Sequence, residues 1–198
     1  ERLKSFFVNK SSFFENSEVI NNAINTTYIN QLKSKIQSKK NPDELVFGYI
    51  GTITAYEGLD FMIESFQELN NKGAQFKLII YGKGDQEEKV KELIEQNSAN
   101  IEFRGPILPE NVYEAYADID AIVNPRIKSE VTDSVTPLKP LEGMAYEKLF
   151  IGSDVGGILE IVKPNVTGII FKAGDKNDFK ETLKLVVKMS NEDKNRLK

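Results

Sequence analysis

A lysine and a carboxylate stand three residues apart in the run TPLKPLEGMA, at positions 136–145. This spacing places Lys139 and Glu142 on roughly the same face of a helix. The helix dipole disfavours a cation in the first turn, so Lys139 indicates an anion nearby. The carboxylate of Glu142 can accept hydrogen bonds from paired ribose hydroxyls, although a glutamate near a helix start is also common as a dipole-stabilising residue. Together with the glycine turn SDVGG at 153–157, the pair suits a nucleoside diphosphate better than a hydrophobic core.

Two further loops could contact the same ligand. The segment from Asn124 to Pro137 is the longest expected between elements, and Arg126 within it could reach a phosphate or be a plain surface charge. The loop GTITAYEG at 51–58 leaves a strand and enters a helix, where free backbone amides can receive a phosphate. Glu57 in that loop would repel a diphosphate, which argues against a direct phosphate role.

Two glycine-containing turns follow other strands, at the end of the sheet where ligands bind, although each is also typical of a structural turn. The first, YGKGD at 81–85, lacks the third glycine of a dinucleotide fingerprint, and the second is RGPI at 104–107. Asp118 and Asp120 form an Asp-x-Asp pattern that could hold a metal. We reject this interpretation because they precede the apolar run 121–123, whereas ligands in such sheets sit at the carboxyl ends of strands.

Short apolar runs alternate with amphipathic segments from about Leu45 onward. The runs are apolar on both faces, which is typical of buried parallel strands, and the segments between them have helical spacing. This alternation predicts an α/β fold with a Rossmann-like doubly wound, mainly parallel sheet. The expected strands of this kind are 46–50, 78–81, 121–123, 149–151 and 169–171, and the segment 101–104 is expected as one more strand. The expected helices include 59–69, 90–94, 179–187 and one that begins near Leu138.

Length and composition limit the remaining possibilities. The 198 residues, 40% of them hydrophobic, can form one good core but not two full domains. A net charge of -4 gives no global attraction for nucleic acid, and the lysine-rich stretch 33–40 lacks interleaved aromatics and predicts a solvated helix face. The absence of cysteine and histidine excludes thiolate and imidazole metal ligands and imidazole acid-base chemistry. Without a signal segment or an apolar run of ~20 residues, a cytoplasmic location is expected.

These motifs together resemble the retaining glycosyltransferases of group 1 (family 4), which have the two-domain GT-B fold. The segment VINNAIN at 19–25 is similar to the stretch that joins the two halves of these enzymes, and the likeness extends to about Phe179. It implies that 1–17 is a remnant of an N-terminal acceptor domain or a linker, and 18–44 an interdomain connection and helix. Residues 45–198 would be the Rossmann-like nucleotide-sugar-binding domain, the C-terminal half of a GT-B fold.

The resemblance also implies transfer of a sugar from a nucleoside diphosphate sugar to an acceptor, with retention at the anomeric carbon. Glu142 matches a family glutamate that holds the ribose. Ser134 stands where relatives have a second acid that contacts the donor sugar, so Asp133 beside it is the candidate. Thr52 and Glu57 replace a basic pair of the family, and the positive charge must come from elsewhere.

Arg126 and Lys139 can supply that charge, and with Asp133 they form the expected catalytic set. No metal or other cofactor is expected, because helix-end amides and these cations would stabilise the diphosphate. The resemblance further implies that the turn at Gly82 lines the nucleoside cleft and that main-chain groups near Gly105 and Ile107 hold the base. The expected donor-binding residues are Gly51, Thr52, Gly82, Gly105, Ile107, Thr136, Leu138, Lys139, Glu142, Gly156 and Gly157.

The expected ligand is a nucleotide sugar, and the expected partner is an N-terminal acceptor-binding domain missing from this chain. Membrane association is expected only through that half, and nucleic acid is not expected. The chain opens at Glu1 without an initiator methionine, which predicts a fragment that is inactive alone. Two alternatives stay open: a non-catalytic nucleotide-binding α/β module, and a GT-B nucleotide-sugar epimerase, which the lack of histidine disfavours. The base, sugar, acceptor and oligomeric state are not specified by the sequence.

Overall fold

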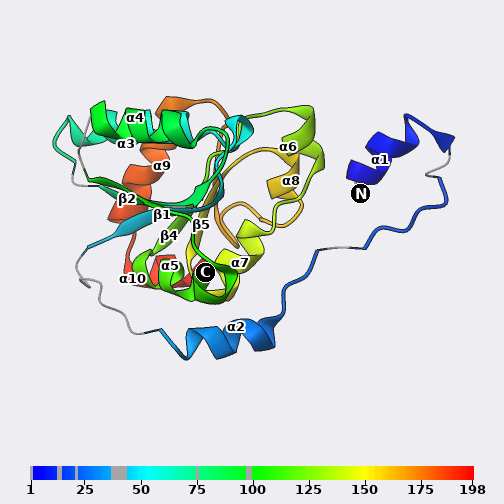
Figure 1. Ribbon diagram of the computed structural model, residues 1–198, viewed down its shortest axis with the longest axis horizontal. Helices are drawn as coiled ribbons and strands as arrows, with labels where there is room; N and C mark the ends of the chain where they lie inside the picture. The colour runs from blue at the N-terminus through cyan, green and yellow to red at the C-terminus, as the bar shows by residue number, and fades with distance from the viewer. Residues whose placement is uncertain (1, 13–14, 21, 37–43, 75, 97–99) are drawn as a thin grey trace.

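The computed structural model describes residues 2–12, 15–20, 22–36, 44–74, 76–96 and 100–198. Six parallel strands form one twisted sheet in the order β3-β2-β1-β4-β5-β6 (Figure 1). The predicted fold class is therefore confirmed. The strands are β1 Val46–Thr52, β2 Lys77–Lys83, β3 Ile101–Gly105, β4 Ala121–Asn124, β5 Leu149–Ser153 and β6 Ile169–Phe171.

Helices cover both faces of this sheet, because alternate residues of the buried strands enter different cores. Phe47 and Tyr49 belong to the core beneath helices α3, α4 and α9. Ile79 and Phe150 belong to the opposite core, with residues of α5 and α8. The helices are α1 Arg2–Val8, α2 Thr26–Lys33, α3 Leu59–Asn70, α4 Glu87–Gln96, α5 Val112–Asp118, α6 Glu130–Ser134, α7 Lys139–Ala145, α8 Gly156–Leu159, α9 Lys176–Lys188 and α10 Asn191–Arg196, with 3-10 turns η2 Ala55–Glu57 and η3 Pro109–Asn111.

The strand order reverses between β1 and β4. The chain runs outward from β1 through β2 to β3, then returns to β4 on the other side of β1. In open α/β sheets, the crevice at such a reversal lies beyond the carboxyl ends of the strands and is the usual ligand site. The loops that follow β1 and β4 are therefore the first places to look for function.

The segment after β4 differs from the expected long loop, because it contains the short helix α6. Ser129 begins this helix as its N-cap: its hydroxyl accepts a hydrogen bond from the amide of Thr132, and the Thr132 hydroxyl accepts one from the amide of Ser129. This reciprocal capping satisfies two amides that would otherwise lack partners at the helix start. Only five residues long, α6 has too little apolar periodicity to be detected by spacing.

Helices α1 and α2 precede the sheet in the sequence and lie outside it (Figure 1). Helix α1 contacts α6. Asn25 caps α2, and Ile29 and Leu32 on this helix are buried. Lys33, predicted on a solvated face, instead donates to the carbonyl of Ala145 at 3.3 Å. Of the same lysine-rich stretch, residues 37–40 lie outside the described part of the chain.

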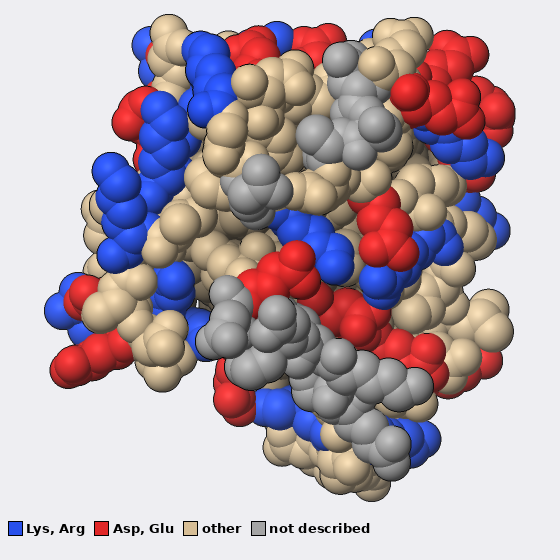
Figure 2. Space-filling model, turned by 90° about the vertical axis from the view of Figure 1, so that its left-hand side faces the viewer, with Lys and Arg blue, Asp and Glu red and all other residues tan. Residues whose placement is uncertain are grey.

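The charged side chains carry both signs on the face shown in Figure 2, where Lys and Arg are interspersed with Asp and Glu. Among the helices in the described part of the chain, none is long and apolar enough to cross a membrane.

Candidate functional site

A pocket of about 540 Å³ opens at the carboxyl ends of β1 and β2. One wall comes from the strand ends and the turn after β3, and the other from α2 and the residues just before it. The location agrees with the expected ligand crevice of a doubly wound sheet. The lining residues include six of the predicted donor-binding residues, namely Gly51, Thr52, Gly82, Ile107, Leu138 and Glu142.

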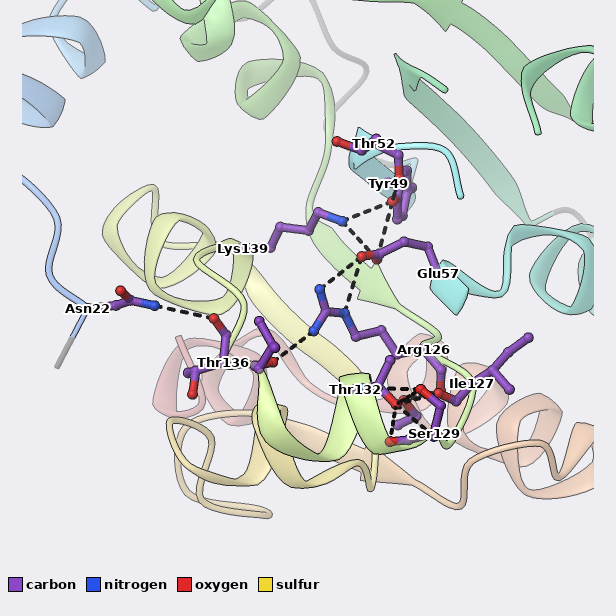
Figure 3. Close-up of polar contacts among 12 residues, drawn as sticks. Asn22, Tyr49, Thr52, Glu57, Arg126, Ile127, Ser129, Thr132, Thr136 and Lys139 are labelled. Carbon is purple, nitrogen blue, oxygen red and sulfur yellow. Dashed lines mark hydrogen bonds and ion pairs between the residues drawn. The ribbon is translucent and has the colours of Figure 1, made fainter. Parts of the chain in front are cut away.

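A cluster of charged side chains lies beside this pocket, between the loops that follow β1 and β4 (Figure 3). The buried carboxylate of Glu57, 3% exposed, is its centre. Its Oε1 accepts hydrogen bonds from Nε and Nη2 of Arg126 at 3.2 and 2.9 Å, and its Oε2 accepts one from Nζ of Lys139 at 2.8 Å. The Lys139 ammonium also donates to the hydroxyl of Tyr49 at 2.9 Å. The expected repulsion of a ligand by Glu57 is therefore offset by two cations that the protein holds against it.

Burial and pairing act in opposite directions on this cluster. Burial opposes ionisation of Glu57, but Lys139 and Arg126 outweigh it and lower the pKa of the carboxyl group below its usual value. Burial likewise lowers the pKa of Lys139, against the attraction of Glu57. Burial, and then the negative charge of Glu57, raise the pKa of Tyr49 far above the ordinary value, so its hydroxyl keeps its proton. With Glu57 ionised and both cations charged, the three groups carry one net positive charge.

Gly51 allows the lysine side chain to reach this position. A Cβ atom at residue 51 would lie 2.2 Å from Cε and 2.5 Å from Nζ of Lys139. Real Cβ atoms essentially never approach so closely, so any side chain here would displace the lysine. Since Gly51 also lines the pocket, the Lys139 ammonium lies directly beside the pocket wall.

Glu142 lines the pocket from α7, one turn after Lys139. Its Oε2 accepts a hydrogen bond from the hydroxyl of Tyr116 at 3.3 Å. Burial, together with the charge of Glu142, raises the pKa of Tyr116 well above the ordinary tyrosine value. The ring of Tyr116 stacks on Tyr146, with 4.1 Å between centroids. Glu142 thus lines the pocket, and its carboxylate accepts a hydrogen bond from one protonated hydroxyl.

The predicted sugar-contacting acid and the glycine turn meet in a second group of residues. Oδ1 of Asp133, on α6, accepts a hydrogen bond from the amide of Gly156 at 2.7 Å. Gly157 is required by close packing, because a Cβ there would lie 2.2 Å from the carbonyl oxygen of Val135. The hydroxyl of Thr136 donates a hydrogen bond to the carboxylate of Glu160. The carbonyl of Thr136 accepts one from the side-chain amide of Asn22 at 3.2 Å (Figure 3).

The structure brings the predicted site residues together in two neighbouring groups. Lys139, Arg126 and the pocket residues surround the end of β1, whereas Asp133 joins the second group at α8. Arg126 is more enclosed than a surface charge, at 7% exposed, and its Nη1 donates to the carbonyl of Val135 at 3.1 Å. Gly105, with φ +73°, ends β3 two residues before Ile107, which lines the pocket.

Sequence reasoning missed Tyr49 and the pairing role of Glu57. The hydroxyl of Tyr49 also donates to the carbonyl of Thr52 at 2.6 Å, which places it at the strand end. Tyr49 lies inside an apolar strand, so its neighbours in sequence do not indicate a polar role. Tyr28 of α2 was also missed as a pocket residue, because no local pattern shows which helix faces a distant strand end.

Both aspartates of the rejected Asp-x-Asp pattern make hydrogen bonds within the fold. Asp120 accepts from the amide of Val46 at 2.8 Å, at the amino end of β1, and Asp118 accepts from the hydroxyl of Tyr81 at 2.7 Å. Within the described residues, no group of three or more acidic, histidine or cysteine side chains could hold a metal ion.

The sheet order and the strand-end pocket define an α/β domain of the doubly wound, Rossmann-like class. Comparison with known proteins is more specific: residues 30–198 match the family described as "Glycosyl transferases group 1". Because this match covers most of the sequence, the chain belongs to the group 1 glycosyltransferase family.

Two curated relatives illustrate the relationship. The chain is 24% identical over 177 residues to the lipopolysaccharide 1,2-N-acetylglucosaminetransferase of Salmonella typhimurium, an alignment that covers 84% of this chain and 45% of that protein. It is 27% identical over 168 residues to a capsular polysaccharide biosynthesis glycosyltransferase of Staphylococcus aureus, covering 83% of this chain and 41% of the relative. The chain therefore spans less than half the length of either relative.

Solved structures share the fold. The C-terminal domain of a group 1 family glycosyl transferase from Francisella tularensis aligns with a TM-score of 0.67 at 18% identity, covering 88% of this chain and 92% of that one. The Anabaena protein HepE, solved with UDP and glucose, aligns with a TM-score of 0.76 at 15% identity, covering 98% of this chain and 53% of HepE. These matches confirm the predicted fold of a GT-B C-terminal half.

Proposed function

We propose that this chain is the donor-binding domain of a retaining glycosyltransferase and that its ligand is a nucleoside diphosphate sugar. The observation that carries the proposal is one arrangement at the end of β1: a pocket, a glutamate that lines it, and a lysine ammonium against its glycine wall. The complex of HepE with UDP supports it by analogy of fold.

Each part of the ligand has a proposed contact. The carboxylate of Glu142 would accept hydrogen bonds from the ribose hydroxyls. The diphosphate would lie near Gly51, beside the ammonium of Lys139, with Arg126 contributing charge from behind Glu57. The turn around Gly82 and Ile107 would surround the nucleoside. The sugar would then extend toward Asp133 and the glycine turn of α8.

The proposed reaction breaks the bond between the anomeric carbon and the diphosphate oxygen and forms a bond from that carbon to an acceptor hydroxyl oxygen. The acceptor hydroxyl gives its proton to the departing diphosphate, and the nucleoside diphosphate leaves. Negative charge develops on the departing diphosphate, and Lys139 would stabilise it without a metal ion. We propose that the acceptor-binding half lies outside this chain. The acceptor side of the catalytic cleft would come from that half, as would any membrane association. A cytoplasmic location is proposed for the donor site.

A thermal-shift screen with UDP, GDP, ADP and their sugars tests the proposal. A ligand at 100 times its dissociation constant adds about 2.7 kcal/mol to the free energy of unfolding, which is easily measured. We expect one nucleotide class to stabilise the chain, equally with and without EDTA. Stabilisation that requires magnesium or manganese would contradict the metal-free site, and no stabilisation by any of these nucleotides would contradict the donor-binding role of this chain. An epimerase would instead convert one nucleotide sugar into another without an acceptor.

A further inference from the structure

The carboxylate of Glu57 contacts the two cations of the site through different oxygens. Two N–H groups of Arg126 donate hydrogen bonds to Oε1, and the ammonium of Lys139 donates one to Oε2. All three side chains are enclosed: Glu57 is 3% exposed, and the side chains of Arg126 and Lys139 are 9% and 17% exposed. One buried acid thus fixes the relative positions of two cations that come from different loops.

The ammonium of Lys139 has three N–H groups. Two of them have acceptors, the hydroxyl of Tyr49 and the carboxylate of Glu57. For the third, the described residues provide no hydrogen-bond acceptor, although Nζ also lies over the ring of Tyr49, 4.5 Å from its centroid. A Cβ on Gly51 would lie 2.5 Å from Nζ, so the ammonium lies next to this glycine, which lines the pocket, although Lys139 itself is not among the lining residues.

We propose that Glu57 is a positioning residue for the diphosphate: it anchors Arg126 and holds the Lys139 ammonium at the Gly51 edge of the pocket. The inference rests on the proposed function. Two effects of Glu57 then have opposite signs. Its charge repels a bound anion, and its hydrogen bonds orient the cation that attracts the anion. Glu57→Gln removes the charge and keeps the shape, so the sign of its effect on affinity shows which effect is larger.

Calorimetry with the parent chain and Glu57→Gln provides the test, using UDP, GDP and ADP together with the corresponding nucleosides. For the diphosphate that the parent binds, we expect Glu57→Gln to weaken binding roughly tenfold or more, because a charge-assisted hydrogen bond to Lys139 is lost. Binding of the nucleoside, which has no phosphate, should be unchanged. The matched control is Glu110→Gln, which removes the same charge from the exposed residue after the pocket-lining Pro109 and should alter affinity little.

Two further variants separate positioning from a purely structural role. Glu57→Asp keeps the charge but is one methylene too short to hold both cations, so positioning predicts weaker binding and repulsion alone predicts no change. In a double-mutant cycle with Lys139→Met, positioning predicts that Glu57→Gln costs little once the lysine is gone. The inference would be overturned if the affinity losses of the two variants were additive, or if Glu57→Gln bound the diphosphate as tightly as the parent or more tightly. Neither result would affect the proposed function. A parent chain that binds none of the diphosphates would overturn the proposed function as well.

Discussion

At the scale of single residues, both cations of this site form ion pairs with one carboxylate of the protein itself. The position of Lys139 in the first turn of α7 is unfavourable for a cation, which indicated an anion nearby. Glu57 is such an anion, 2.8 Å from the ammonium. From sequence alone, Lys139→Met would be expected to leave the unliganded stability unchanged or slightly higher. The ion pair changes that expectation to a loss, because truncation of one partner leaves a buried carboxylate with fewer contacts.

Glu142→Gln is the first residue-scale prediction. The change keeps the side-chain shape and removes the charge that would accept from the ribose, so nucleoside diphosphate affinity should fall by about ten- to a hundredfold, or roughly 1.5–3 kcal/mol. Calorimetry measures the affinity, and thermal unfolding should show that the fold survives. Tyr116→Phe is the control, since it removes the 3.3 Å hydrogen bond to Glu142 and leaves the carboxylate in place. Equal affinity in Glu142→Gln and the parent would mean that Glu142 only stabilises the start of its helix and does not bind the ribose.

The pKa of Glu57 gives a second prediction, for stability against pH. Its folded-state pKa lies below the unfolded value, so its ionised form stabilises the fold above about pH 5, and that stabilisation is lost as pH falls through the folded pKa. Glu57→Gln should cost about 3 kcal/mol at pH 7, and the difference from the parent should shrink as the pH falls below about 5 and through the folded pKa. Urea unfolding of both proteins across this range measures it. A difference that stayed constant with pH would mean that the charge of Glu57 does not support the fold.

At the scale of elements, the close contact between α8 and the end of α6 depends on a glycine. A Cβ on Gly157 would lie 2.2 Å from the carbonyl oxygen of Val135 and 2.8 Å from that of Thr132, and backbone atoms cannot rotate away. Gly157→Ala should destabilise the chain by about 1–3 kcal/mol, measured by urea unfolding. Gly143→Ala in α7 is the matched control, because its Cβ would meet only side-chain atoms at 3.5 Å or more and alanine favours a helix. Similar stabilities for the two variants would contradict the tight contact.

The elements also show what the sequence can and cannot predict. All six strands were expected. Five are apolar on both faces, which marks a buried parallel strand, whereas β3 alternates apolar and charged residues. The sheet then places its ligand crevice at the strand ends. Glu142 could be found because its neighbours in sequence form a motif. The pairing of Glu57 with Lys139 could not, because residues so far apart in sequence meet only through the sheet topology. The same reason hides Tyr28 on α2, whose place in the pocket wall depends on where the helix packs.

At the scale of the whole molecule, we expect this chain to bind a donor and not to transfer its sugar. The predicted donor residues and the pocket lie together at one edge of the sheet, and the chain spans less than half the length of its curated relatives. The purified chain, incubated with the nucleotide sugar that it binds, should release no nucleoside diphosphate above the rate of the uncatalysed reaction. Measurable glycosyl transfer by this chain alone would show that no second half is needed.

Titration calorimetry tests the central claim most directly, with UDP, GDP and ADP added to the parent chain and to the double variant Lys139→Met, Glu142→Gln. The account predicts that the parent binds one of these diphosphates and that the double variant loses about a hundredfold or more in affinity, because both the ammonium beside Gly51 and the carboxylate in the pocket are gone. Full affinity in the double variant would contradict the account, because the ligand would then bind without the two residues around which the site is built.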